Sequence, residues 1–418
     1  MSNAGSDSNN GLSSSSPVKT LNKVNSLSLR SGDAVLFRAG DTFRGHVTLK
    51  NGVTYSSYGT GPKPRIYGSP CNAAKEGSWT QTYMANIYKY SQNFSDDAGT
   101  LVFNDGEAGC AYKVILMRDY YNNTFHPETR KPFSSWQDLT RDLDMYHDLN
   151  TGSIYLYSAS GNPSTRFNSI EILTRANIFD GWGMGSNSTA VIDNLCIKYT
   201  GAHGVGTGSI NSLTVTNCEI GWIGGSIQKD NPKPTSEGSY SRPTRYGNGV
   251  EIYGTCQYFR VQHNWIYQIY DAGATHQYSE DKAGLYMDNV SYLDNLIERC
   301  VYAIEYRITT SDNYVEQSGM RNFQIRGNIL RMTGPWSWGY QRTNKDSPAA
   351  IKTWKNQNRA SDFVMEGNII DRGRPTLLNI NATRPEWMPV CRANVYLQEE
   401  GVDIGTMREK NPKVIYVK

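Results

Sequence analysis

The sequence contains no apolar run that approaches the roughly 18 residues of a membrane-spanning helix. It also lacks any cluster of one charge, because its 42 Lys and Arg residues are scattered among 39 Asp and Glu residues and the formal net charge is +3. A protein that binds nucleic acid needs a basic patch that tracks the phosphates. We therefore expect neither a membrane span nor a nucleic-acid partner.

Motifs that bind metals or cofactors are missing as well. The chain has no His-Glu-x-x-His, no Cys-x-x-Cys, no EF-hand loop and no nucleophile-elbow serine. Residues 204–208 (GVGTG) imitate a dinucleotide-binding loop, but no βαβ pattern surrounds them, so we interpret them as turn glycines. No cofactor is expected, and a structural Ca²⁺ at Asp7-Ser8-Asn9 or between coils stays an open alternative that no motif indicates.

The seven cysteines cannot all form disulfides, because their number is odd. Cys196, Cys218 and Cys300 lie close to repeated asparagines, where their side chains are expected to enter or border a core. We predict buried free thiols rather than disulfides.

The start of the chain lacks the basic residues and the apolar stretch of a signal peptide. Met1-Ser2-Asn3-Ala4 is typical of the remnant of an expression tag, and residues 5–16 are predicted to form a polar loop. We expect that a native export signal has been removed, and that the natural protein is secreted, periplasmic or held at the cell surface.

Residues 17–70 are predicted to form an N-terminal cap and a first coil. Val18, Leu21, Val24 and Leu27 space apolar side chains as a short amphipathic helix does. Such a helix would cover one end of a stacked core, which otherwise exposes apolar surface and unpaired strand edges. Residues 32–68 then read as the first coil.

A repeated sequence pattern occupies the second half of the chain. Short strands rich in Val, Ile and Tyr end in an asparagine at Asn194, Asn217, Asn264, Asn295, Asn328 and Asn368. These asparagines are 23, 47, 31, 33 and 40 residues apart, as in a repeat whose coils carry insertions of variable length. Asparagine tolerates the left-handed backbone region, and amides stacked in register can form a ladder.

This pattern resembles that of right-handed parallel β-helix proteins. We predict an all-β solenoid over residues 166–418, with Asn217, Asn264, Asn295, Asn328 and Asn368 stacked at one corner and a cap after Pro385. An antiparallel β-sandwich or a propeller is the alternative.

The repeat disappears between residues 71 and 165, where we predict an inserted β-rich lobe. Parallel coils are expected to resume at Ile170-Glu171-Ile172. Loops are expected to bulge out at residues 225–246, 275–283, 308–320 and 340–349, and three of them are expected to follow one edge of consecutive coils and to build a groove there.

Aligning the coils on their asparagines brings polar side chains together. Glu305 and Trp338 lie ten residues after their asparagines, and His276, Arg307 and Tyr340 lie twelve after theirs. Neighbouring coils are about 4.8 Å apart, so we predict that Arg307, Trp338 and His276 form a substrate-positioning wall. The residues that we expect to bind substrate are Glu251, His276, Gln277, Arg307, Trp338, Tyr340, Arg342 and Lys352.

Aromatic residues accompany these charges, and they are either core residues or a platform on which sugar rings stack. They are Tyr270, Tyr302, Tyr306, Trp336, Trp338 and Tyr340.

Carboxylates on adjacent coils are what glycoside hydrolysis requires, because one protonates the leaving oxygen while the other activates water or attacks the anomeric carbon. Asp271 and Glu305 form the predicted catalytic pair, and Glu251 and Asp288 are further candidates. The alternative for any one of them is a structural ion pair with a neighbouring arginine.

Several longer phrases carry a more specific resemblance. They are RYGNGVEIYG, IYQIYDAGATHQ, GLYMDNVSYLDNLIERCVYAIEYR and NFQIRGNILRMTGPWSWGYQR, together with an opening coil that reads SGDAVLFRAGDTFRGHVTLKNG. From about residue 32 to residue 370 the chain resembles a bacterial β-helix glycoside hydrolase family that contains α-fucosidase and xylanase activities. The resemblance implies a carbohydrate substrate and a catalytic role for Asp271, and it does not transfer the identity of the sugar.

The sequence thus predicts a monomeric glycoside hydrolase that acts on a polysaccharide or an oligosaccharide. One alternative is a polysaccharide lyase, in which Arg307, Lys352 or a bound Ca²⁺ neutralises a uronate while His276 or a tyrosine removes a proton. The other is a non-catalytic, adhesin-like rod that binds glycans.

Overall fold

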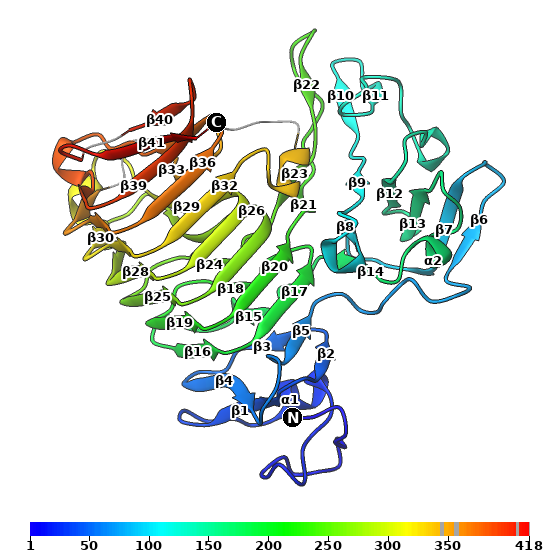
Figure 1. The fold of residues 1–418 in the computed structure, drawn as a ribbon, viewed down its shortest axis with the longest axis horizontal. Coiled ribbons are helices and arrows are strands. Elements are labelled where there is room, and N and C mark those ends of the chain that lie inside the picture. The colour runs from blue at the N-terminus through cyan, green and yellow to red at the C-terminus, as the bar shows by residue number, and fades with distance from the viewer. Residues whose placement is uncertain (343–346, 355–358, 407–408, 418) are drawn as a thin grey trace.

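The computed structural model describes residues 1–342, 347–354, 359–406 and 409–417, and it is all-β, with long ladders of parallel strands (Figure 1). The chain repeatedly runs from a strand of a first sheet into a second, larger sheet and then returns to the first. Each return adds one parallel strand beside the previous one. No sheet in the described part of the chain closes on itself.

The first sheet is a single parallel ladder of short strands. In spatial order they are β1 (Ala34–Arg38), β4 (Val53–Tyr58), β16 (Thr189–Asp193), β19 (Ser212–Thr216), β25 (Tyr258–Gln262), β28 (Val290–Leu293), β31 (Gln324–Arg326), β35 (Val364–Glu366) and β38 (Val390–Arg392). Side chains along these strands alternate between buried and partly exposed, as expected for a sheet with one face on a core.

The second sheet consists of two parallel ladders that share two long strands, β26 (Trp265–Ser279) and β29 (Leu296–Thr309). One ladder adds β2 (Thr42–Arg44), β5 (Arg65–Tyr67), β17 (Cys196–Thr200), β20 (Glu219–Ile223), β32 (Ile329–Thr333), β36 (Ile369–Gly373), β39 (Val395–Glu399) and β41 (Lys413–Val417). The other adds β3 (Val47–Thr48), β15 (Phe179–Gly181), β18 (Val205–Thr207), β24 (Val250–Tyr253), β33 (Ala349–Thr353), β37 (Thr376–Asn379) and β40 (Asp403–Gly405). A small parallel sheet contains β27 (Tyr286–Asp288), β30 (Gly319–Arg321) and β34 (Ala360–Ser361).

Antiparallel strands stand beside this stack (Figure 1). One sheet contains β6 (Trp79–Gln81), β7 (Ile87–Asn93), β13 (Ser153–Tyr157) and β12 (Asp144–Asp148), with β9 (Tyr112–Lys113) parallel to β12. A second contains β10 (Met117–Asp119), β11 (Thr124–Phe125) and β22 (Tyr240–Ser241). Two further pairs are β8 (Ala98–Phe103) with β14 (Ile170–Thr174), and β21 (Ser226–Lys229) with β23 (Thr244–Tyr246). The helices are short: α1 (Leu21–Ser26), α2 (Pro163–Arg166), and the 3-10 turns η1 (Asn104–Gly106), η2 (Trp136–Asp138), η3 (Val315–Gln317), η4 (Trp338–Gln341) and η5 (Pro385–Trp387).

The expectation that parallel coils resume at Ile170 is wrong. β14 pairs antiparallel with β8, and Ile170 and Ile172 are buried in the separate core of the antiparallel segment. The parallel ladders resume at β15, whose Phe179 pairs with Val47 of β3 and thereby bridges the long insertion. The run Ile170–Thr174 resembles a coil strand because it is largely apolar and buried on both faces, with Ile170 and Ile172 in the core of the antiparallel segment and Leu173 in a further cluster with Tyr199 and Trp222.

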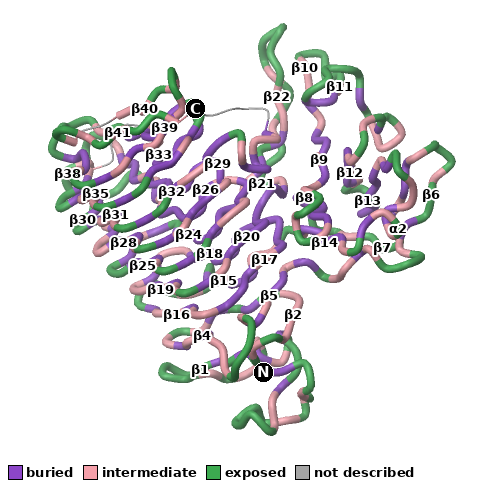
Figure 2. Tube along the Cα trace, in the orientation of Figure 1, coloured by how far each residue is buried: buried purple, intermediate pink, exposed green. Residues whose placement is uncertain are grey.

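The main core lies inside the stack, where the apolar side chains of the parallel strands meet. Figure 2 shows buried residues along the strands and exposed residues at the outer turns. The predicted capping helix is present as α1, whose Leu21 and Val24 are buried in this core. Cys196, Cys218 and Cys300 are buried thiols without disulfides, as predicted. In the described residues no helix is long and apolar enough to cross a membrane.

An asparagine ladder runs through five successive coils. The side-chain amide nitrogens of Asn264, Asn295, Asn328 and Asn368 donate to the amide oxygen of the next asparagine at 2.9–3.0 Å, and Asn394 receives the last of these bonds. The ladder is buried, and each amide nitrogen also donates to a backbone carbonyl such as Val261 O. The predicted ladder is therefore confirmed from Asn264 to Asn368.

Asn217 is not part of the ladder, contrary to the prediction. It has a φ of 52°, and so does the equivalent turn position of later coils, Asp294. The residue in the ladder position of that coil is Cys218, whose backbone nitrogen donates to Asn264 Oδ1 at 2.8 Å. Asparagine suits both adjacent positions, the left-handed turn and the ladder, so the sequence pattern merged two roles.

Replacing Asn295 with Ala is expected to lower the free energy of unfolding by about 1–3 kcal/mol, because the buried backbone nitrogen of Asn264 and the backbone oxygen of Val261 lose their bonds. Urea unfolding measures the loss. Asn150→Ala is the control, because Asn150 is exposed in the antiparallel segment. Equal stability of the two variants would contradict a structural role for the ladder.

Candidate active site

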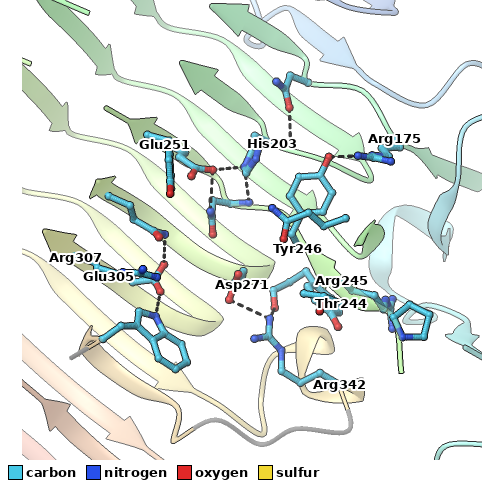
Figure 3. A pocket seen from close by; sticks show the side chains of 18 of the residues that line it. Arg175, His203, Thr244, Arg245, Tyr246, Glu251, Asp271, Glu305, Arg307 and Arg342 are labelled. Carbon is cyan, nitrogen blue, oxygen red and sulfur yellow. Dashed lines mark hydrogen bonds and ion pairs between the residues drawn. The ribbon is translucent and has the colours of Figure 1, made fainter. Parts of the chain in front are cut away.

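A cavity of about 730 Å³ opens where the second sheet faces the β21/β23 hairpin (Figure 3). The residues that line it are Ile115, Arg175, Asn177, Trp182, His203, Gln228, Arg242, Pro243, Thr244, Arg245, Tyr246, Asn248, Glu251, Tyr253, Tyr270, Asp271, Gln277, Glu305, Arg307, Arg342 and Trp354. Three of them are carboxylic acids and five are arginines. The cavity is therefore strongly polar and unlike the apolar core beneath it.

Strand register places two of the carboxylic acids in one row. Glu251 of β24 pairs with Thr275 of β26, and Thr275 pairs with Glu305 of β29. Parallel strands keep in-register side chains on the same face of a sheet, so Glu251 and Glu305 both face the cavity, two strand steps apart. Gln277 and Arg307 form the next outward-facing pair in the same direction along β26 and β29.

The Glu305 carboxyl group is held in place although it is almost fully buried. Its Oε2 accepts a hydrogen bond from Gln277 Nε2 at 2.8 Å, and its Oε1 accepts one from the indole nitrogen of Trp354. Burial and then the negative charge of Asp271 raise the pKa of Glu305 to about 8, and the bond from Trp354 only partly offsets them. At neutral pH Glu305 is therefore mainly protonated and can act as an acid.

Asp271 lies in a β-bulge of β26. Ile269 pairs with Cys300 and Ala272 pairs with Tyr302, so two residues, Tyr270 and Asp271, face a single residue of β29. A bulge changes the direction of a side chain relative to the regular strand. It turns Asp271 into the cavity, where Oδ1 accepts a hydrogen bond from Arg342 Nη2 at 3.1 Å (Figure 3).

Arg342 is itself anchored. Its Nη2 also donates to the backbone oxygen of Tyr270 at 2.6 Å, and its guanidinium lies 4.6 Å from the centre of the Tyr270 ring. Burial works against the charge of Arg342, but the negative charge of Asp271 outweighs it and raises the pKa of the guanidinium. Arg342 therefore stays charged and orients Asp271.

Glu251 forms a buried pair with His203. Its Oε2 lies 2.8 Å from His203 Nδ1 and accepts a hydrogen bond from Asn248 Nδ2 at 3.1 Å. Burial alone would raise the pKa of Glu251, but the attraction of His203 and these hydrogen bonds outweigh it, so the pKa is lowered. Glu251 and Glu305 thus share a row but differ in protonation state, a difference that their environments impose.

The rim of the cavity is rich in arginine. Arg307 donates to Ser279 and Thr309, and Arg175 donates from Nε to the hydroxyl oxygen of Tyr246 at 3.3 Å. Arg245 is buried and donates to backbone oxygens of the hairpin and of β8, so it joins these segments. The two outer arginines can offer remaining N–H groups to hydroxyl or acidic groups of a ligand.

His276 does not reach the cavity, and its predicted place in the substrate-positioning wall is wrong. The ring is fully buried in the main core, with Nδ1 2.7 Å from the hydroxyl oxygen of Tyr292 and the ring stacked on Tyr306. Burial lowers the pKa of His276 to about 3, so it is neutral. It pairs with Tyr306 rather than with Arg307 because the bulge at Asp271 shifts β26 by one residue relative to β29.

Trp338 belongs to the packing beneath the cavity rather than to its wall. It lies in the 3-10 turn η4 with 7% of its surface exposed, packs on Tyr270, and donates its indole N–H to Gln268 O at 2.8 Å. The alignment on asparagines failed here because the part of β29 that contains Glu305 pairs with β33, not with the segment around Trp338. Part of the expected loop 340–349, residues 343–346, lies outside the described residues.

The remaining predicted residues divide between the cavity and its surroundings. Gln277, Arg307 and Arg342 line the cavity, whereas Tyr340 and Lys352 are not among the described residues that line it. Lys352 pairs with Glu305 in register, is buried, and places its ammonium 4.6 Å from the centre of a ring of Trp354. Asp288 lies in the small sheet and forms an ion pair with Arg321, so it is remote from the carboxylates of the cavity.

Sequence reasoning missed the side of the cavity formed by His203, Trp182, Arg175 and Tyr246. His203 lies two residues before strand β18 and directly before the glycine-rich residues 204–208, which the sequence analysis interprets only as a turn. Strand pairing places His203 at the site, because Gly206 of β18 pairs with Glu251, which the sequence analysis names as a candidate.

Among the comparisons with known proteins, one solved structure supports the fold. Neither family models nor curated proteins match the chain. A solved structure described as a glycoside hydrolase matches with a TM-score of 0.54 and 11% identity, covering 99% of this chain and 95% of the other. The complex of XylC with xylose matches with a TM-score of 0.45 and 14% identity over 97% and 69% of the two chains. A GH136 lacto-N-biosidase from Eubacterium ramulus matches with a TM-score of 0.39 and 13% identity over 100% and 66%.

Proposed function

We propose that this protein is a glycoside hydrolase that cleaves a polysaccharide or an oligosaccharide in the cavity of the second sheet. The observation that carries the proposal is the contrast between Glu305, whose pKa is raised to about 8, and the ion-paired Asp271 in the same cavity. Glycoside hydrolysis needs a protonated carboxyl group and an ionised one on either side of the scissile bond.

In this proposal Glu305 is the general acid. It donates its proton to the glycosidic oxygen as the bond to the anomeric carbon breaks, so the leaving sugar departs as a neutral alcohol. Asp271 is the partner that removes a proton from water or attacks the anomeric carbon, and Arg342 holds it in position. Gln277 and Trp354 fix the direction of the Glu305 carboxyl group.

We further infer that the stacked strands form a right-handed parallel β-helix, with residues 17–70 as cap and first coil, residues 71–165 as an inserted lobe, and residues 166–418 as the helix and its C-terminal cap. The repeated passage between the two large sheets supports this path. β14 then belongs structurally to the lobe, although it follows residue 165. Secretion to the periplasm, the cell surface or the medium, action as a monomer, and the absence of a required metal complete the proposal.

A second candidate, a polysaccharide lyase, is favoured by one observation. The Glu251–His203 pair resembles a base that is oriented by a carboxylate, and Arg175 or Arg307 could neutralise a uronate. Here His203, not His276, would remove the proton next to the uronate carboxylate.

Activity on a panel of polymers tests both candidates. Purified protein is incubated with xylan, pectin, alginate, fucoidan and chondroitin sulfate, and reducing ends and ultraviolet absorbance are followed together. A hydrolase releases reducing ends without absorbance, whereas a lyase also creates a conjugated double bond that absorbs. Binding without either signal would favour the glycan-binding rod and contradict the proposal.

The raised pKa of Glu305 predicts a pH dependence of both activity and stability. Activity should fall as the pH rises through about 8, because the acid loses its proton. Between its ordinary value of 4.5 and about 8, the native state holds a proton that the unfolded chain has lost, so stability should fall as pH rises through that window. Melting temperatures measured across this window should show a smaller fall for Glu305→Gln than for the parent. Parallel curves would contradict the raised pKa.

A further inference from the structure

Two exposed aromatic side chains extend the cavity beyond Glu251. Trp182 is 43% exposed and Tyr253 is 40% exposed, and both line the cavity. Their ring centres are 6.4 Å apart at an interplanar angle of 40°. Of the other aromatic rings that line the cavity, Tyr270 is buried, and Tyr246 and Trp354 are only partly exposed.

These two residues come from neighbouring parts of the same ladder. Tyr253 follows Glu251 by two positions on β24, so both point to the same face of the sheet. Trp182 directly follows β15, whose Asp180 pairs with Gly206, which in turn pairs with Glu251. The aromatic pair therefore borders the same row that carries the carboxylates.

Two glycines of the stretch around β18, Gly206 and Gly208, leave room for the Trp182 side chain. A Cβ atom at Gly206 would lie 3.2 Å from the Trp182 indole nitrogen and 3.2 Å from the Asn177 amide nitrogen. A Cβ atom at Gly208 would contact the Trp182 ring at 3.6 Å. Neither glycine has a positive φ, so the backbone does not require glycine there. The absence of side chains at these two positions thus lets the indole lie directly against the strand.

The distance from Gly206 to the proposed acid follows from the register. Gly206, Glu251, Thr275 and Glu305 occupy consecutive strands, so three steps of about 4.8 Å place Gly206 about 14 Å from Glu305 along the stack. A sugar ring that lies against Trp182 and Tyr253 is therefore not the ring whose bond Glu305 protonates.

We propose that Trp182 and Tyr253 form a remote sugar-binding subsite, and that the ligand is a chain of several sugar residues lying across the parallel strands. This inference rests on the proposed function and adds a preference for length. The flat apolar faces of sugar rings stack on aromatic rings, while Asn177 and His203 beside them offer polar atoms to hydroxyl groups. A glycan too short to span the row cannot use the subsite.

Kinetics on a ladder of oligosaccharides test the subsite. The oligosaccharides are prepared from the polymer of the panel that the protein cleaves or, if none is cleaved, binds. In Trp182→Ala and Tyr253→Ala, the ratio of kcat/KM for the longest substrate to that for the shortest should fall by about tenfold. Tyr258→Ala is the matched control, because Tyr258 is 54% exposed on β25 of the first sheet and its variant should keep the parent ratio.

Binding separates this inference from the proposed function. Affinity electrophoresis through gels that contain each polymer measures retention of the parent, of the aromatic variants and of Gly206→Val, whose side chain would displace the Trp182 indole. Loss of retention in the three variants but not in Tyr258→Ala supports the subsite even if no polymer is cleaved. Cleavage with an unchanged length ratio overturns the subsite alone. A parent that is neither retained nor active on any polymer overturns both.

Discussion

Replacing Glu305 with Gln is expected to lower the rate of glycan hydrolysis by a factor of about 10²–10⁴, the range that a positioned general acid contributes. Glutamine keeps the shape of the side chain and can still accept a bond from the Trp354 indole, but it carries no transferable proton. Binding of the glycan should change little, and below about pH 4.5, where Glu305 is uncharged in both the native and the unfolded state, the melting temperature should match that of the parent. Reducing-end release and affinity electrophoresis on the same preparation measure the two properties.

Two further variants make this result specific. Asp271→Asn should lose activity to a similar degree, because an amide cannot act as a base or a nucleophile. Glu366→Gln is the matched control, since Glu366 lies on β35 of the first sheet and pairs with Arg326 and Arg392 at the surface. Near-parental turnover by Glu305→Gln or by Asp271→Asn would remove that residue from the mechanism, and Glu251 would become the next candidate.

Replacing Asp97 with Ala is expected to destabilise the protein by about 3–5 kcal/mol, because it leaves the buried ammonium of Lys113 without its partner. Asp97 also accepts a hydrogen bond from the backbone nitrogen of Ile227 at 2.6 Å, which ties the antiparallel segment to the β21/β23 hairpin. Burial opposes the charge of Asp97, but the attraction of Lys113 prevails and holds the pKa of Asp97 well below its ordinary value.

Urea unfolding measures this loss, with Asp230→Ala as the control. Asp230 forms an ion pair with Arg118 at 2.9 Å, but its side chain is 63% exposed, and such pairs contribute at most about 1 kcal/mol. If the two variants unfolded at the same urea concentration, the buried pair would not hold these segments together. Activity should fall in Asp97→Ala as well, since the hairpin forms one side of the cavity.

The sequence was informative wherever one side chain has one structural role. The repeated asparagines predicted the buried ladder, the spaced apolar residues predicted the capping helix, and the odd number of cysteines predicted free thiols, all of which are present. The long strands β26 and β29 carry the carboxylates that residue type and position had singled out, Asp271 and Glu305.

Prediction of the site failed where equal residue spacing from the asparagines was taken to mean pairing between neighbouring strands. One extra residue at the Asp271 bulge rotates every following side chain of β26 to the other face, which sent His276 into the core and placed Gln277 beside Arg307. A bulge has no reliable signature in a single sequence, because any residue can be the extra one. The contribution of His203 was equally hidden, since it depends on pairing between strands separated by a long insertion.

The asparagine ladder also has a direction. Every side-chain amide donates toward the next coil and accepts from the previous one, and the series ends at Glu409, whose carboxylate accepts from Asn394 Nδ2 at 3.0 Å. A further coil with asparagine at this position would donate and accept in the same way, so it would need no new partner. The chain can therefore gain or lose whole coils in evolution while its connecting loops vary freely in length, provided that one terminal acceptor remains.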